Sequence, residues 1–249
     1  MTLDPGLAAL RPLGGFFVLR TVAEGAGADG APPPTLAETY AAAGAGVDPN
    51  ALTSRVATVA DRLATRETRV AASIAHQALA ARLWSPALAC AALYGSVPDL
   101  APRLLRWDGS AAAPDDLQLR GVRGLPGDAG TLAETVLLGH LEPLGAALRA
   151  RYGIAAGLLR GNAASTLAGA ARELDRWAHA HGRTDVAVRS SELTSALFAH
   201  PLLRGTGSRT GTAFRRRSCC LYYRVPGGGV CGDCCFTRPP RSSPRAPSG

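Results

Sequence analysis

The sequence predicts a mainly α-helical protein, with an α+β arrangement as the alternative. We expect a helical body with a short strand element, followed by a small cysteine-rich module. The 249 residues are 47% hydrophobic, which is enough for a sizeable core. Apolar side chains recur at helical spacing over residues 51–66 and 68–83. Five of the six cysteines lie within residues 218–236.

Local signals predict where the first helices begin and end. Thr35 and Glu38 have the spacing of a capping box, in which each side chain satisfies a free backbone amide. Asp48 followed by Pro49 predicts a second helix with proline at its first position. Ser85-Pro86 is expected to interrupt the apolar helix that starts near residue 68, because proline lacks an amide hydrogen.

The second half of the body is also predicted to be helical. A second TLAET motif at residues 131–135 predicts the cap of a helix that runs towards Arg149. The small-residue segment 154–180 and the segment 186–199 are expected to form two more helices. Strand patterns occur only at residues 13–22 and 117–122.

Composition divides the chain into four parts. Residues 1–203 form the body, 204–214 a Gly/Ser/Thr linker, 215–236 the cysteine module and 237–249 a disordered tail. Residues 1–200 hold 18 arginines and 18 acidic residues, whereas residues 201–249 hold nine arginines and a single acid, Asp233. The whole net charge of +8 therefore belongs to the cysteine-bearing end of the chain.

Several classes of protein are disfavoured by the sequence. No basic segment precedes the first apolar stretch, as a signal peptide would require, and no apolar run reaches about 18 residues. In the basic end, aromatic residues do not alternate with basic ones as in a single-strand binder, and the motifs of a nucleic-acid binder are absent from its sequence. We therefore expect a cytoplasmic protein without a transmembrane segment or nucleic-acid partner. In that reducing compartment, clustered cysteines favour a metal site over disulfides.

The cysteine spacing is Cys219-Cys220, ten residues, Cys231, two residues, Cys234 and an adjacent Cys235. Four thiolates bind zinc or an iron–sulfur cluster, and spacing alone does not choose between them. Adjacent side chains point apart, which disfavours a single ion and favours a two-iron cluster. Zinc and, less so, a thiol redox pair stay open as alternatives.

The residues around these cysteines suit an anionic cofactor. Gly229 and Gly232 are expected to let the backbone approach inorganic sulfur, and Arg217 and Arg224 to offset the thiolate charge. A plain hairpin turn and a solvated arginine face would also explain them.

The segment RRRSCCLYYRVPGGGVCGDCC closely resembles the C-terminal iron–sulfur segment of the FhuF-like ferric siderophore reductase family, whose signature is C-C-x10-C-x2-C. RVAASIAHQALAARLWSPAL (69–88), VPDL (97–100) and GNAASTLAGA (161–170) are similar to the helical part of that family. The resemblance implies a [2Fe–2S] cluster and reduction of siderophore-bound Fe(III) in the cytoplasm. The signature matches four cysteines: Cys219, Cys220, Cys231 and Cys234. Cys235 lies outside it and is an alternative last ligand.

The sequence also indicates an electron donor and candidate substrate-binding residues. Gly25-x-Gly27-x-x-Gly30 is followed by prolines instead of a helix, so it is not a dinucleotide site, and the electron is expected from a ferredoxin or a flavoprotein reductase. Polar residues within apolar helices are candidates for binding the ferric siderophore: Arg69, Ser73, Gln77, Asn162 and Ser165. The competing reading is a sensing or interaction protein with a structural zinc or iron–sulfur site.

Overall fold

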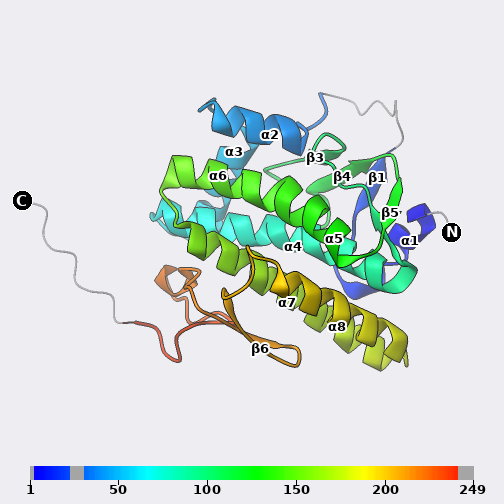
Figure 1. The fold of residues 1–249 in the computed structure, drawn as a ribbon. Coiled ribbons are helices and arrows are strands. Elements are labelled where there is room, and N and C mark those ends of the chain that lie inside the picture. Colours follow the sequence, from blue (N-terminus) through cyan, green and yellow to red (C-terminus); the bar gives the residue numbers. More distant parts are fainter. Residues whose placement is uncertain (1–2, 23–30, 241–249) are drawn as a thin grey trace, which may run out of the picture.

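The computed structural model of the protein describes residues 3–22 and 31–240 (Figure 1). Helices dominate it, which confirms the predicted class. The rejected glycine motif at 25–30 lies outside the described residues, as does most of the tail expected at 237–249. Within the described ranges, no helix combines the length and apolar character needed to cross a bilayer.

Helix α4 (Thr68–Tyr94) is the central element of the body. It packs against α3 (Ala51–Arg62), α7 (Ala156–Ala180) and α8 (Thr184–Ala199), and α6 (Glu142–Tyr152) lies on its other side (Figure 1). Its side chains are buried around most of its circumference, and Leu83, Trp84 and Leu88 are inaccessible to solvent. A helix buried on all sides needs apolar residues on every face, which explains why residues 68–94 show little amphipathicity.

The expected interruption at Ser85-Pro86 is wrong, because α4 continues through both residues. Proline removes only one bond of the helical ladder, the one to the carbonyl of Arg82. Ser85 is buried and Pro86 lies within the packed part of the helix, so tertiary contacts on both sides offset this local cost.

Helix caps follow the sequence closely but not at every position. The Thr35–Glu38 capping box is present and starts α2 (Leu36–Gly44). The second helix, α3, starts two residues later than predicted: Asn50 is its N-cap, and Pro49 precedes the cap. The later helix is capped by Asp128, which accepts the amide of Thr131 at 2.9 Å. It continues from α5 (Ala129–Leu132) through a π-helical segment, η2 (Ala133–Leu141), into α6.

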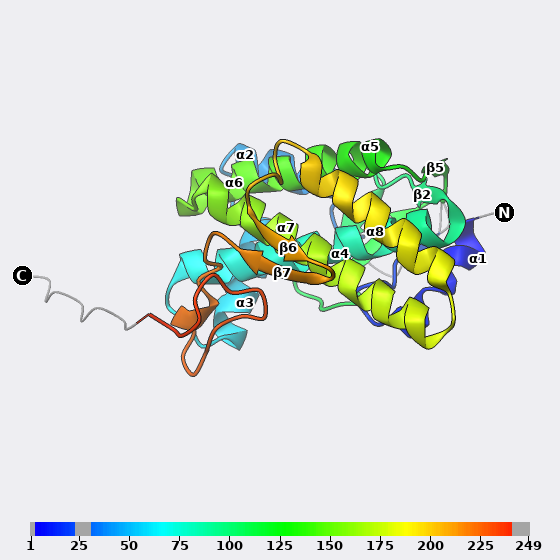
Figure 2. The same cartoon turned by 60° about the horizontal axis from the view of Figure 1, so that its bottom comes forward.

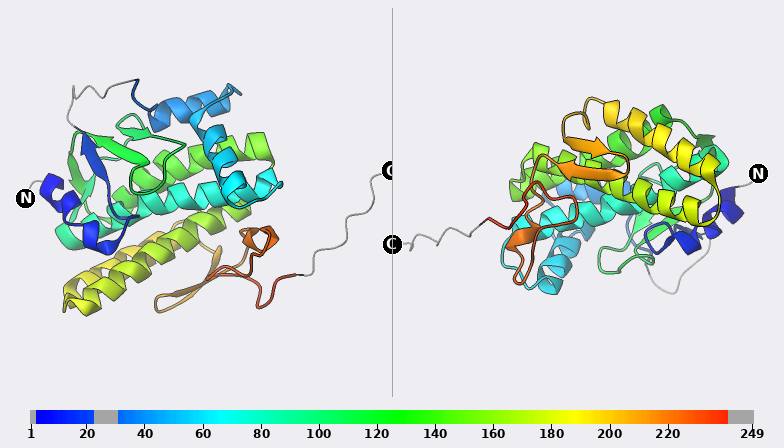
Figure 3. Two further views of the ribbon diagram at one scale, coloured as in Figure 1. Left: turned by 180° about the vertical axis from the view of Figure 1, so that it is seen from behind. Right: turned by 90° about the horizontal axis from the view of Figure 1, so that it is seen from below.

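The strand element is a small sheet with the order β1-β4-β3. Strand β1 (Arg20–Val22) runs parallel to the central strand β4 (Leu117–Arg120), and β3 (Leu105–Trp107) runs antiparallel to β4. A separate pair joins β2 (Ser96–Pro98) to β5 (Gly124–Pro126). The first strand is shorter than the predicted 13–22, because Leu13 ends a 3-10 turn, η1 (Arg11–Leu13), and a further turn follows, in which the amide of Phe17 donates to the carbonyl of Gly14 at 3.0 Å. The sheet and the cysteine module lie at opposite ends of the body (Figure 3, left).

The expected linker is a β-hairpin. Within residues 204–214, β6 (Gly207–Thr210) pairs with β7 (Ala213–Arg216), and β7 packs on α7 (Figure 2). Phe214 is buried against this body and lies 5.3 Å from Phe198 of α8, measured between ring centroids. Because the hairpin is anchored to α7 and α8, it fixes where the cysteine module starts.

Candidate metal centre

The cysteine module follows β7 without a break and folds as a loop beside α4 and α7. One 3-10 turn, η3 (Tyr222–Arg224), separates Cys219 and Cys220 from the remaining cysteines. Leu221 and Gly227 have left-handed backbone angles, φ 71° and 69°, which reverse the chain on either side of that turn. A second tight turn, from the amide of Cys234 to the carbonyl of Cys231 at 3.0 Å, brings the C-x-x-C pair together.

The five cysteine side chains of the module lie close enough for each to affect, or be affected by, the titration of another. The contact between Cys220 and Cys231 shifts the pKa of the two thiols in opposite directions. The thiol of Cys235 is within hydrogen-bonding reach of both Cys219 and Cys234. Within the described residues, no three His, Cys, Asp or Glu side chains are arranged around one point as ligands of a single ion. The thiols thus form one pair, Cys220 with Cys231, and one set of three, in which Cys235 interacts with both Cys219 and Cys234.

Backbone amides point at two of these sulfurs. The amide of Leu221 donates to Cys219 Sγ at 3.2 Å, and that of Phe236 to Cys234 Sγ at 3.4 Å. Amide donors of this kind stabilise negatively charged sulfur, so the loop fits thiolates that ligate a metal.

The titration of the thiols differs from one to the next. Burial raises the pKa of Cys219 to about 11. The hydrogen bond from Cys231 lowers the pKa of Cys220, and the same contact together with burial raises that of Cys231. When no cation is bound, Cys220 is therefore the thiol of this pair that loses its proton first.

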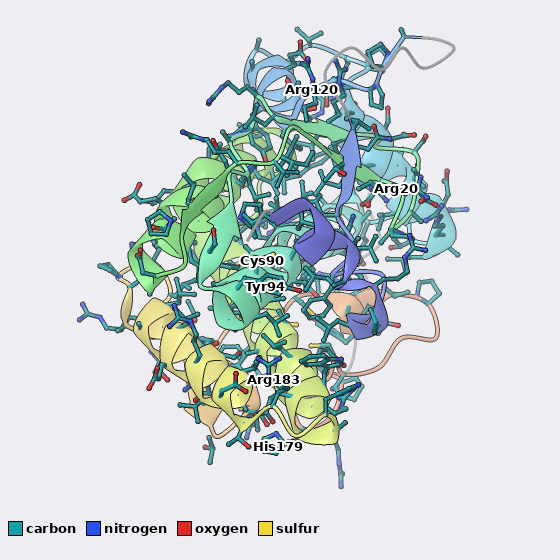
Figure 4. The ribbon with its side chains drawn as sticks, turned by 90° about the vertical axis from the view of Figure 1, so that its right-hand side faces the viewer. Arg20, Cys90, Tyr94, Arg120, His179 and Arg183 are labelled. Carbon is teal, nitrogen blue, oxygen red and sulfur yellow. The ribbon has the colours of Figure 1, made fainter. Side chains whose placement is uncertain are left out.

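The sixth cysteine, Cys90, belongs to the body. It is fully buried on α4, and burial raises its pKa to about 12. Figure 4 shows it one turn before Tyr94, whose hydroxyl donates to the carbonyl of Gly6 at 3.2 Å. This position agrees with an inert thiol that packs in the core.

Three of the five substrate candidates lie where the module meets the body. Ser73 Oγ donates to the Cys220 carbonyl at 2.8 Å, and Asn162 Nδ2 donates to the Ser73 carbonyl at 3.0 Å. Gln77 Nε2 donates to Asn162 Oδ1 at 3.0 Å. These contacts give the three residues a role in holding the module, while substrate binding by them stays a prediction.

The other two substrate candidates differ from each other. Ser165 Oγ donates to Asp233 Oδ2 at 2.7 Å, and Arg172 pairs with the other oxygen of that carboxylate at 3.3 Å. Asp233 is buried between Cys231 and Cys234, so Ser165 also anchors the module. Arg69 is exposed on the first turn of α4, and its side chain makes no hydrogen bond or ion pair with another described residue.

The structure describes the surroundings of the arginines and glycines predicted around the cysteines, while the approach of the two glycines to a cofactor stays a prediction. The Arg217 side chain is exposed, and Arg224 pairs with Glu67 at 3.0 Å. Gly229 and Gly232 have open space where a side chain would start. Their neighbour Gly228 is the crowded position: a Cβ there would lie 2.7 Å from the Tyr222 carbonyl oxygen. The buried arginine is Arg216, which the sequence did not distinguish from its two neighbours.

A pocket of about 480 Å³ opens beside the module. Its walls come from residues 13–17, from α4, from α7 and from the loop at residues 231–233. The lining includes two of the substrate candidates together with apolar and module residues: Phe16, Phe17, Gln77, Ser165, Cys231 and Asp233. Residues far apart in the sequence thus enclose one space that a cysteine of the module adjoins.

Gly161 on α7 allows the module to lie close to the body, and this gives a testable prediction. A Cβ at Gly161 would overlap Ser218 Oγ and lie 3.2 Å from Arg216 Nη2. We expect Gly161→Ala to displace the start of the module at a cost of about 1–3 kcal/mol in unfolding free energy. Iron content per protein should fall, as measured after anaerobic purification.

Gly157, one turn earlier on the same helix, provides the matched control. A Cβ there meets nothing within 4 Å. Gly157→Ala should therefore keep the iron content and raise helix stability by about 0.5–1 kcal/mol. Equal iron content in the two variants would contradict close packing of the module at Gly161.

Comparison with known proteins supports the centre that this geometry indicates. A family model described as the FhuF 2Fe-2S C-terminal domain matches residues 216–236, the segment that holds all five clustered cysteines. A search of curated proteins found no match to the chain. A [2Fe–2S] cluster requires four protein ligands, and the gathered thiols with their amide donors fit that requirement. The chain thus carries a FhuF-type [2Fe–2S] domain at residues 216–236, in agreement with the FhuF-like family that its cysteine signature resembles.

Proposed function

We propose that this protein is a cytoplasmic ferric siderophore reductase that transfers one electron to siderophore-bound Fe(III) and releases Fe(II). The observation that carries this proposal is the pocket beside Cys231, which is walled by the helical body and open to solvent. A protein that only carried electrons would need an exposed centre, but it would not need a pocket of about 480 Å³ next to it.

The residues of the chain divide into a cofactor site and a substrate site. We propose that Cys219, Cys220, Cys231 and Cys234 hold the cofactor. When bound, a [2Fe–2S] cluster supplies a carrier for one electron. Gln77, Ser165 and residues 13–17 line the adjoining space. There Gln77 offers its amide group to the oxygen-rich surface of a ferric chelate, while the Ser165 hydroxyl donates to Asp233 in the wall. Phe16 and Phe17 add apolar contact.

Reduction suffices to release the metal. Hard anionic oxygen ligands bind Fe(III) much more tightly than Fe(II), so one electron weakens the complex. We expect that electron to come from a ferredoxin or a flavoprotein reductase, since the sequence has no flavin or nicotinamide motif. Each turnover oxidises the donor by one electron and reduces one Fe(III).

The proposal is tested with anaerobically purified protein that has been reduced chemically. Its visible absorption should return when a ferric hydroxamate, catecholate or carboxylate siderophore is added, and a ferrous chelator should trap one Fe(II) per electron. The corresponding gallium complex has the same shape and charge but accepts no electron, so it should leave the protein reduced. If no ferric siderophore reoxidises the protein, the substrate assignment fails. A colourless protein that contains zinc would support the sensing or interaction role instead.

A further inference from the structure

Arg216, the last residue of β7, is a buried cation without a carboxylate partner. Its side chain is 3% exposed, and none of the described Asp or Glu side chains forms an ion pair with it. The other buried arginines, Arg55 and Arg82, share the carboxylate of Asp116. A buried charge without a counter-charge is costly, so the fold must supply Arg216 with negative charge from another source.

The hydrogen bonds of Arg216 hold the guanidinium in place but do not neutralise it. Nε donates to the Ser218 carbonyl at 3.0 Å, and Nη2 donates to the Leu158 carbonyl at 3.3 Å and to Asn162 Oδ1. These acceptors are uncharged. Nη1 is buried and has no hydrogen-bond partner among the described residues.

The groups that Arg216 affects electrostatically are two cysteines and one histidine. Hydrogen bonds place this guanidinium beside the module: Asn162, which accepts from Nη2, donates to Ser73 Oγ at 3.1 Å, and Ser73 Oγ donates to the Cys220 carbonyl at 2.8 Å. The Arg216 amide also donates, at 2.9 Å, to the carbonyl of Asp233, which lies between Cys231 and Cys234 in the sequence. In keeping with this placement, the charge of Arg216 lowers the pKa of both Cys220 and Cys231. Burial, with a smaller contribution from Arg216, lowers the pKa of His76 to about 3, so this histidine is neutral at physiological pH. Among the groups that these contacts bring near Arg216, the cysteines of the module are the ones that carry negative charge when they ligate a metal.

We propose that Arg216 is a positioning residue whose guanidinium supplies the counter-charge to the Cys220 and Cys231 side of the centre and thereby raises its reduction potential. Reduction adds one negative charge, and a fixed cation in a buried environment stabilises the more negative state. Asn162, on α7 of the body, accepts a hydrogen bond from the guanidinium and holds it at this place. The body would therefore affect the reduction potential of the centre through one side chain. The inference rests on the [2Fe–2S] domain and on its proposed role in electron transfer, and it does not depend on which substrate is reduced.

The test compares midpoint potentials of purified holoproteins, measured by anaerobic spectroelectrochemical titration. Arg216→Gln should shift the potential to more negative values by about 59 mV or more, which is at least about tenfold in the one-electron equilibrium. Arg216→Lys keeps the charge and should restore most of the difference. Arg217→Gln removes the same charge from an exposed neighbour, where solvent screens it, and should leave the potential nearly unchanged.

A second variant covers the case in which Arg216→Gln does not retain the cluster. Asn162→Asp places a carboxylate against the guanidinium in the existing contact, so it should also shift the potential to more negative values. An unchanged potential in Asn162→Asp, or in a fully loaded Arg216→Gln variant, would overturn the inference. A shift in Arg216→Lys as large as that in Arg216→Gln would also overturn it, because geometry and not charge would then set the potential. Reoxidation of the wild-type protein by ferric siderophores is measured separately, so either proposal can fail alone.

Discussion

A Cys220→Ser variant should be isolated without the cofactor and with its helical body folded. Cys220 is 2% exposed, and its side chain contacts Cys231 at the centre of the thiol group. A serine hydroxyl at this place ionises far less readily than a thiol, so the site would lose a ligand. The contact from Ser73 reaches the backbone carbonyl of residue 220 and survives the substitution. We expect loss of visible absorption, iron and labile sulfide, with helical circular dichroism unchanged.

Cys235→Ser is the matched control in the same loop. Cys235 contacts Cys219 and Cys234 but lies outside the four proposed ligands. Colour and iron content should therefore be close to those of the wild type. Loss of the cofactor in Cys235→Ser, with retention in Cys234→Ser, would move the last ligand to Cys235. A Cys220→Ser protein that keeps a full complement of iron and sulfide would contradict the ligand set itself.

Features that depend on neighbouring residues were predictable from the sequence. The Thr35–Glu38 cap and the helix over 154–180 follow from residues within a few positions of each other, and both are confirmed. The cysteine spacing favoured a two-iron cluster and left zinc open, and the resemblance of the segment to a known family predicted the [2Fe–2S] cofactor, which the family model supports.

Features that depend on distant partners were not predictable in the same way. Asn162 and Ser73 are 89 residues apart, and nothing near either one indicates their contact. Pro86 carries a strong local signal for a helix end, but packing of α4 on both sides overrides it. Residues 204–214 have linker composition, and the burial of Phe214 against the body makes them a hairpin instead. Successive side chains of β7 point to opposite faces, so Arg216 is buried like Phe214, whereas Arg215 is exposed. The sequence of three arginines does not show which of them this register turns inward.

The second large effect is expected at Arg82, which holds one wall of the pocket in place. Its Nη1 donates to the carbonyls of Gly15, Phe16 and Val18 at 3.1, 2.9 and 2.6 Å. Its Nε donates to Asp116 at 2.9 Å, and the side chain is 1% exposed. One buried guanidinium therefore joins α4 to the N-terminal segment that faces the cysteine module across the pocket.

Arg82→Met should lower the free energy of unfolding by about 3–5 kcal/mol, because it removes one partner of a buried ion pair. The three carbonyls of the N-terminal segment would lose their donor as well, so the pocket wall should no longer be held in position. For the folded fraction, we expect KM for a ferric siderophore to rise about tenfold or more, as misplacement of substrate contacts does. Chemical denaturation and steady-state Fe(II) release measure the two effects.

Arg55→Met is the control that distinguishes a loss of stability from a displacement of the pocket wall. Arg55 also pairs with Asp116, at 3.4 Å, but its other acceptor is the Asp108 carbonyl and it does not touch the N-terminal segment. This variant should lose stability while its KM stays near that of the wild type. Arg82→Lys, which keeps the charge but has fewer donors, should fold better than Arg82→Met and still show the raised KM. Equal KM values in the Arg82 and Arg55 variants would mean that the segment at 13–18 does not form the substrate site, and the pocket beside Cys231 would then have to serve another ligand.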